Sequence, residues 1–285
     1  MHSSCILTDT SAQFPQPMFP GKNLVRVTPL DIQVNNQLYP EGKDVKIARM
    51  PPSITPDFQQ RLVTPNAEKL HEIFSNLIQN YDQVLVIFMS DQLSPLYHQA
   101  ELAIAPLQSH SNITLINSQT ISVGLGILVQ VAAGLLEQGA PLSEAERQVR
   151  RLIPHIYTLL CPPGLTYLHQ AGILDHAQAT IGEMLNLYPL FTIEEGSLTP
   201  IEKVRNYRSV LDFFQEFLGE FDSLRQIAFL QGAPPLLTES RTLRQFAQET
   251  YPQTPYSEHT ISPFLATLIG PRCLGMVTAE NIPLR

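Results

Sequence analysis

The stretch 81–100, YDQVLVIFMSDQLSPLYHQA, contains the corner that decides the fold. Residues 84–89 form a short, continuous apolar run, which predicts a buried strand. A helix is expected over 95–108, and Ser90 and Ser94 lie between the two elements. Hydroxyl groups and a proline therefore occupy a position where a phosphate-binding loop needs glycine.

Strands and helices alternate on both sides of this corner. Apolar residues recur at helical spacing from Leu70 to Ile78, which predicts an amphipathic helix over 66–80. A strand is expected over 112–118 and a long helix over 122–138. Alternation with short connections is typical of a parallel sheet in an α/β domain.

The sequence predicts two domains. The α/β domain is expected over 1–152, with one or two strands in 24–34 and a proline-rich surface loop or flap at 40–65. Hairpins mix with helices over 153–285, which favours a C-terminal α+β domain. In that domain we expect a hairpin turning at Glu195 and Gly196, a helix over 207–221, and two short strands around Gly270 and Pro271.

The charge balance excludes some partners. The 285 residues include 18 basic and 26 acidic side chains, so the net charge is -8. Nucleic acid and anionic membranes favour clustered Lys and Arg, so neither is expected as a partner. Residues 121–139 are the most apolar segment, but Gln130 and three glycines interrupt them, and a buried helix fits better than a membrane span.

The N-terminus and the cysteines indicate the compartment. Residues 1–15 lack the basic start and apolar stretch of a signal peptide. Three widely spaced cysteines indicate reduced thiols rather than a disulfide framework, so a cytoplasmic location is expected.

Three corners place a small polar residue before a helix: Thr64, Ser94 and Ser118. These residues could simply cap the helices that follow. In a parallel sheet, however, such corners meet at the carboxyl ends of the strands, where ligands bind. Helix N-termini attract anions there, and hydroxyl groups suit a small carboxylate head.

Other chemistry has little support in the sequence. No G-x-S-x-G elbow surrounds any serine, and no third ligand accompanies His169 and His176. The glycines of GLG at 124–126 do not complete a dinucleotide fingerprint. No metal and no cofactor are predicted.

An ordered series of motifs runs along the chain. The segments LTDTSAQFP, VTPLDIQVNNQLYPEGKD and LINSQTISVGLGILV are similar to the patterns D-S-T-x-D-L-P, V-P-L…Y-x-D-G-x-D and I-D-S-x-x-x-S-x-G-x-G. The corner at 81–100 resembles the loop pattern S-S-x-L-S-G-T-Y-x-S-A, and residues 165–205 follow L-x-Y-L-x-x-G-G-R-I through K-V-R. In this order, the motifs resemble those of the DegV family, the fatty-acid-binding proteins that include the B subunit of bacterial fatty acid kinase.

The resemblance implies a long-chain fatty acid between two domains, with its tail in an apolar tunnel and its carboxylate held by hydroxyl groups. Ser94 matches the family's second serine, and Thr64 aligns with its T-S-x-P-S hydroxyls only after a shift. Arg205 matches the arginine of K-V-R. Ser90 and Ser118 complete the expected polar set, and residues such as Met184, Leu185 and Leu187 are expected along the tunnel.

The chain departs from the family pattern at the expected head-group site. Pro95 and Leu96 replace the glycine and threonine after Ser94, Ile173 replaces the arginine of G-G-R-I, and Leu268 replaces the histidine of T-H-T-G-P-G. A cation and a histidine are thus missing, which puts docking to an acyl kinase subunit in more doubt than acyl binding. Arg272 could supply the missing positive charge.

The leading hypothesis is a non-enzymatic fatty-acid-binding protein. Two alternatives use the same cleft: an enzyme for a small anionic substrate, and a degenerate scaffold that has lost its lipid. The first lacks a nucleophile–base pair in the sequence.

Overall fold

The computed structural model describes residues 3–55, 57–107, 113–185 and 187–282. Its N-terminal half is built on a parallel sheet in the order β2-β1-β6-β7. The strands are β1 (Ser4–Asp9), β2 (Val25–Thr28), β6 (Gln83–Phe88) and β7 (Ile113–Asn117). The predicted parallel α/β domain is therefore confirmed.

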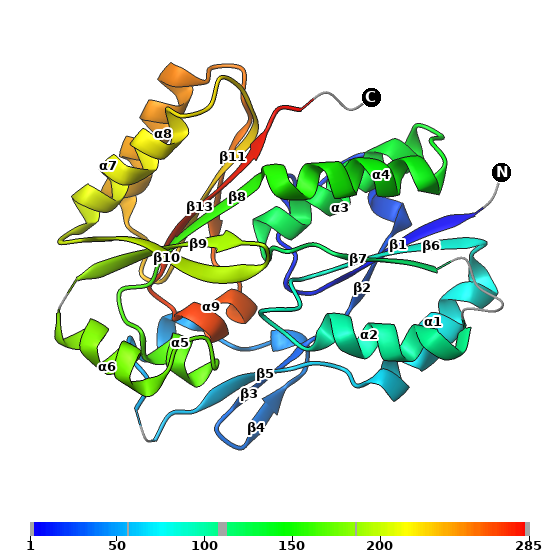
Figure 1. Cartoon of the computed structure of the whole chain (residues 1–285), viewed down its shortest axis with the longest axis horizontal. Coiled ribbons are helices and arrows are strands. Elements are labelled where there is room, and N and C mark those ends of the chain that lie inside the picture. The colour runs from blue at the N-terminus through cyan, green and yellow to red at the C-terminus, as the bar shows by residue number, and fades with distance from the viewer. Residues whose placement is uncertain (1–2, 56, 108–112, 186, 283–285) are drawn as a thin grey trace.

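Helices cover both faces of this sheet (Figure 1). The helices α1 (Ala67–Asn80) and α2 (Leu96–Ile104) lie on one face, and α3 (Val123–Glu137) and α4 (Leu142–Leu152) lie on the other. The apolar stripe of α1 is directed inward, with Leu70, Phe74 and Leu77 buried. This is the amphipathic pattern that the sequence predicts.

The C-terminal half contains a six-stranded, mostly antiparallel sheet in the order β10-β9-β8-β13-β11-β12. Its strands are β8 (Ile156–Cys161), β9 (Tyr188–Glu194), β10 (Ser197–Val204), β11 (Leu224–Gln231), β12 (Tyr256–Thr260) and β13 (Leu274–Glu280). The helices α7 (Tyr207–Leu218) and α8 (Leu237–Thr250) cover its outer face (Figure 1). This confirms the expected α+β half and the β9–β10 hairpin.

The helix α3 joins the two halves. It contacts β1 and β6 of the parallel sheet and also β8 and β13 of the larger sheet. Its residues from Val123 to Val129 are all buried, as expected for a helix that is apolar on every side. Among the described helices, none combines the length and hydropathy needed to cross a bilayer.

A third, small sheet lies below the two larger sheets in the view of Figure 1. It has the order β4-β3-β5 and comprises β3 (Asp31–Val34), β4 (Gln37–Tyr39) and β5 (Gln60–Val63). The segment 24–34 thus forms two strands, β2 and β3, which belong to different sheets. The predicted loop at 40–65 is only partly correct, because its last residues form β5.

The structure corrects the prediction for the chain's last segment. Residues Pro263–Ile269 form the helix α9, where a strand was expected before Gly270, and only β13 follows as a strand. Ser262 caps this helix by accepting a hydrogen bond from the Leu265 amide, and Pro263 occupies its first turn. The helix packs against β5 and against the short helix α5 (Thr166–Gln170), which precedes α6 (His176–Met184).

Candidate functional site

The ends of β1, β6 and β7 form one polar corner. The buried carboxylate of Asp9 accepts hydrogen bonds from the Met89 and Ser11 amides, both at 2.9 Å, and from the Ser11 hydroxyl. Burial raises the pKa of this carboxyl, and these hydrogen bonds oppose the rise. Asp9 thus fastens the end of β1 to the end of β6. The motif LTDTSAQFP contains Asp9, but the hydrogen bond by which Asp9 links two strands cannot be inferred from the sequence.

Ser90 is buried at this corner and connects the two halves. Its hydroxyl donates a 2.7 Å hydrogen bond to the Gly196 carbonyl in the β9–β10 turn and accepts one from the Gln92 amide. Its amide donates to the Thr120 carbonyl at 2.9 Å. The hydroxyl proton of Ser90 is therefore already in use.

Ser118 lies beside Ser90, at the end of β7. Its amide donates to the Phe88 carbonyl at 3.0 Å, and its hydroxyl donates to the Thr120 carbonyl at 3.1 Å. The hydroxyl of Thr120 in turn lies 3.3 Å from that of Thr158 on β8. Ser118 shapes the corner rather than capping α3, which has no side-chain cap.

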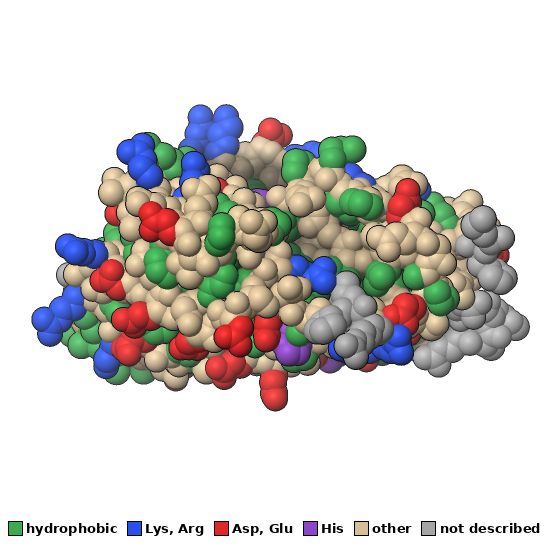
Figure 2. Space-filling model, turned by 90° about the horizontal axis from the view of Figure 1, so that it is seen from above, with side chains coloured by type: hydrophobic (Ala, Val, Ile, Leu, Met, Phe, Trp, Pro, Cys, Tyr) green, Lys and Arg blue, Asp and Glu red, His purple; other side chains and the backbone are tan. Residues whose placement is uncertain are grey.

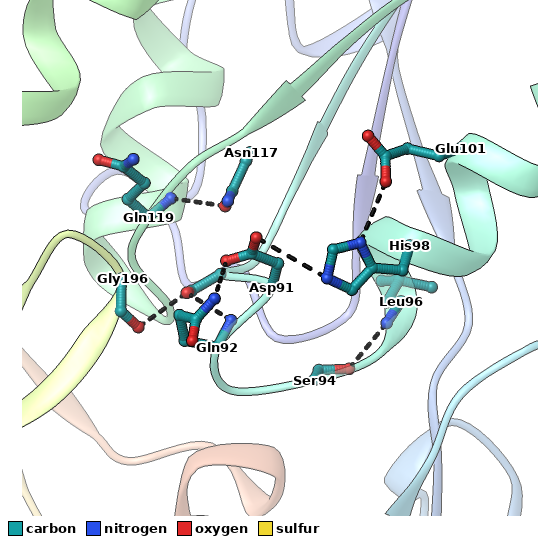
Figure 3. A network of polar contacts seen from close by, with 10 residues as sticks. Asp91, Gln92, Ser94, Leu96, His98, Glu101, Asn117, Gln119 and Gly196 are labelled. Carbon is teal, nitrogen blue, oxygen red and sulfur yellow. Dashed lines mark hydrogen bonds and ion pairs between the residues drawn. The ribbon is translucent and has the colours of Figure 1, made fainter.

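Ser94 differs from these two serines. It is 5% exposed, and its hydroxyl oxygen accepts a 3.3 Å hydrogen bond from the Leu96 amide two residues ahead (Figure 3). The N-cap of α2 is Pro95 and this helix has no side-chain cap, so the prediction that Ser94 caps it is wrong. In the described part of the chain, its hydroxyl proton has no acceptor. A buried hydroxyl with an unused proton is a donor available to a ligand.

Thr64 also keeps an unused hydroxyl proton, and it does not cap a helix either. The N-cap of α1 is Asn66, whose side chain accepts a hydrogen bond from the Lys69 amide. The capping prediction for Thr64 is therefore wrong. Its half-buried hydroxyl has no hydrogen-bond partner among the described residues.

The two predicted cations lie apart from the serine corner. Arg205, after β10, and Arg272, before β13, are both exposed. Within the described residues, neither makes a hydrogen bond or ion pair with Ser90, Ser94 or Ser118. Leu268 is buried on α9, and Ile173 is partly buried and packs against the core, so both departures place apolar side chains on the core.

A histidine with two acidic neighbours lies beside the corner (Figure 3). The ring of His98 on α2 lies 3.0 Å from Glu101 and 3.9 Å from Asp91. These three residues could not be grouped from the sequence alone. No group of three or more His, Cys, Asp or Glu residues in the described chain could hold a metal ion.

A cavity of about 570 Å³ lies beside α5 and α6. Its volume falls in the range of small-molecule sites. Ile54, Thr55 and Gln59 line one wall and residues of the two helices line the other, Ala179 and Met184 among them. From Gln59, β5 leads to Thr64 over about 16 Å at about 3.3 Å per residue. Met184 lines this cavity but is 81% exposed, and Leu185 is also exposed.

Comparison with known proteins identifies relatives along the whole chain. A family model described as an uncharacterised protein of the DegV family matches residues 4–281. The chain is 27% identical over 218 residues to the DegV domain-containing protein TTE1491 of Caldanaerobacter subterraneus, covering 76% of this chain and 77% of the relative.

Solved structures share the fold. A fatty-acid-binding DegV family protein of Streptococcus agalactiae superposes with a TM-score of 0.84 at 20% identity, covering 99% of this chain and all of that one. The Fak B3 protein of Streptococcus pneumoniae fatty acid kinase, loaded with linoleic acid, gives 0.81 at 18% identity over 98% of this chain and all of that one.

Proposed function

The chain belongs to the DegV family, and on that premise we propose that it binds a long-chain fatty acid. The site lies between a first domain of residues 1–152 and a second of residues 153–285. The unused hydroxyl protons of Ser94 and Thr64 carry the proposal. A carboxylate accepts hydrogen bonds and donates none, so it complements two free O–H donors.

The acyl chain supplies most of the affinity. About 14 buried methylenes at ~0.8 kcal/mol each contribute roughly 11 kcal/mol before the cost of association. The apolar part of the cavity beside α5 and α6 receives the tail. Orientation of the head then requires few polar contacts, which is compatible with apolar side chains at Ile173 and Leu268.

The protein acts by binding and not by catalysis. Ser90, Ser94 and Ser118 have no histidine within hydrogen-bonding distance in the described chain, so none is an activated nucleophile. The similarity to the Fak B3 protein supports a role in presenting the bound acid to an acyl kinase subunit. Exposed Arg205 and Arg272 offer two positive charges for such docking.

Native mass spectrometry of the purified protein tests the proposal. A co-purified long-chain acid is the expected result. Ser94→Ala and Thr64→Val should each weaken oleate binding about five- to tenfold in a displacement assay, because each removes one polar contact of ~1 kcal/mol. Ser143→Ala, on the exposed surface of α4, is the matched control and should bind as the wild type does. Unchanged affinity in both site variants would refute the role of the two hydroxyl groups in holding the carboxylate. A purified protein that carries no fatty acid and takes up no oleate would refute fatty-acid binding itself.

A further inference from the structure

A second cavity, which shares no lining residue with the one beside α5 and α6, lies where the larger sheet splits. The strands β8 and β9 pair only at Leu159–Thr192 and Leu160–Phe191 in the described chain. From there the β9–β10 hairpin diverges from β8 toward the middle of the molecule (Figure 1). The hydrogen bond from Ser90 to Gly196 holds the hairpin tip in this position.

The resulting groove has a volume of about 960 Å³. Ile156 and Tyr157 of β8 form one wall, Ile193 and Ile201 of the hairpin form the other, and Phe217 of α7 adds an aromatic surface. The ring of Tyr157 packs edge-on against Phe217 at 5.9 Å between centroids. The groove therefore offers apolar surface to a ligand's side chains.

Strand edges face this groove. Ile156, Tyr157 and Thr158 pair with β13 on one side, but on the other side they have no strand partner among the described residues. Ile193 and Glu194 pair with β10 and likewise have no partner on the β8 side. An extended peptide can use such an edge for backbone hydrogen bonds, and its alternate side chains then enter the groove.

The charge of the groove is negative. Glu194 and Glu195 are the only charged residues among the described residues that line it. Burial raises the pKa of the Tyr157 phenol, and the nearby carboxylate of Glu280, which lies 2.7 Å from the His155 ring, raises it further. Acidic side chains also gather along the lower edge of the half that holds α7 and α8 (Figure 2).

We propose that this groove binds an extended, basic peptide segment of a partner protein, which adds as a strand to the free edge of β8. Lysine or arginine side chains of the segment meet Glu194 and Glu195, and its apolar side chains contact Ile156 and Phe217. A fatty acid is unsuited to this groove, because its carboxylate would face two others. The peptide site is therefore distinct from the proposed acyl site and does not depend on it.

Fluorescence anisotropy with the full chain tests the proposal. The probe is a labelled short peptide of alternating valine and lysine, and its matched competitor carries glutamate in place of lysine. The lysine peptide should bind, and the glutamate peptide should bind at least tenfold more weakly. Glu194→Gln combined with Glu195→Gln should lower affinity for the lysine peptide about tenfold.

Two controls separate the groove from general charge. Glu68→Gln combined with Glu137→Gln removes the same charge from exposed helix positions elsewhere and should leave affinity unchanged. A lysine peptide that is N-methylated at alternate residues loses the backbone N–H donors along one of its edges. It should therefore bind at least tenfold more weakly than the unmethylated peptide.

Several results would overturn the proposal. One is equal binding of the lysine and glutamate peptides, and another is an equal loss of affinity in the control double variant. If the N-methylated peptide bound as tightly as the lysine peptide, the groove would not bind an added strand. If tetramethylammonium alone displaced the lysine peptide completely, the groove would be a site for organic cations. A dimer in sedimentation that disappears in the groove variant would assign the groove to a second copy of the chain.

Discussion

The hydroxyl of Ser90 and the carbonyl of Gly196 are 106 residues apart in sequence and 2.7 Å apart in space. This hydrogen bond joins the end of a parallel strand to the turn of an antiparallel hairpin. It fixes the polar corner with Ser94 and also holds open the groove between β8 and β9.

Ser90→Ala should destabilise the protein by about 1–3 kcal/mol, because the Gly196 carbonyl and the Gln92 amide lose a buried partner. Urea unfolding measures this change. Ser143→Ala, on an exposed helix position, should stay within about 0.5 kcal/mol of the wild type. A Ser90 variant as stable as that control would show that the contact carries no stability.

Gly196→Ala should be more damaging than Gly139→Ala. Both glycines have a φ of 86°, so both variants incur the cost of left-handed backbone, about 1 kcal/mol. At Gly196 a new Cβ would also lie 2.5 Å from the Ser90 hydroxyl, whereas at Gly139 nothing lies within 4 Å. Thermal unfolding of the two variants isolates the effect of this crowding, and equal losses would contradict it.

Asn66→Ala should cost about 1 kcal/mol of unfolding free energy, because α1 loses its N-cap. Thr64→Ala, two residues earlier, removes no hydrogen bond among the described residues and should cost less than half as much. Chemical denaturation of the pair tests which residue caps the helix. The reverse order of stabilities would restore Thr64 to that role.

His259 should make the protein less stable in mild acid. Burial lowers the pKa of its ring, which lies 2.9 Å from the Ser257 hydroxyl. The folded pKa is thus below the unfolded value of about 6.5, so this stabilisation is complete above that pH and is lost as the pH falls toward the folded pKa. In His259→Gln, the free energy of unfolding should fall less between pH 7.5 and 5.5. An identical fall in both proteins would rule out this contribution.

The sequence predicted the elements whose pattern is strong. The stripe from Leu70 to Ile78 gave α1, and the apolar run at 84–89 gave β6, because periodicity follows directly from which face is buried. The helix α9 was missed because it is short and apolar on all sides, although Ser262 and Pro263 are a recognisable helix start.

The site was less predictable than the fold. Ser94 could be selected from the chain, since a hydroxyl before a proline and a helix is a local signal. The difference between Ser94 and Ser90 could not, because it depends on whether a distant carbonyl takes the hydroxyl proton. Local sequence also gave no sign that Asp9 would receive the Met89 amide.

The helix α3 contacts strands of both large sheets. If either half were produced alone, one greasy side of this helix, or the sheet face that it covers, would be left facing water and would promote aggregation. Gene fragments cut between the halves should therefore yield insoluble polypeptide.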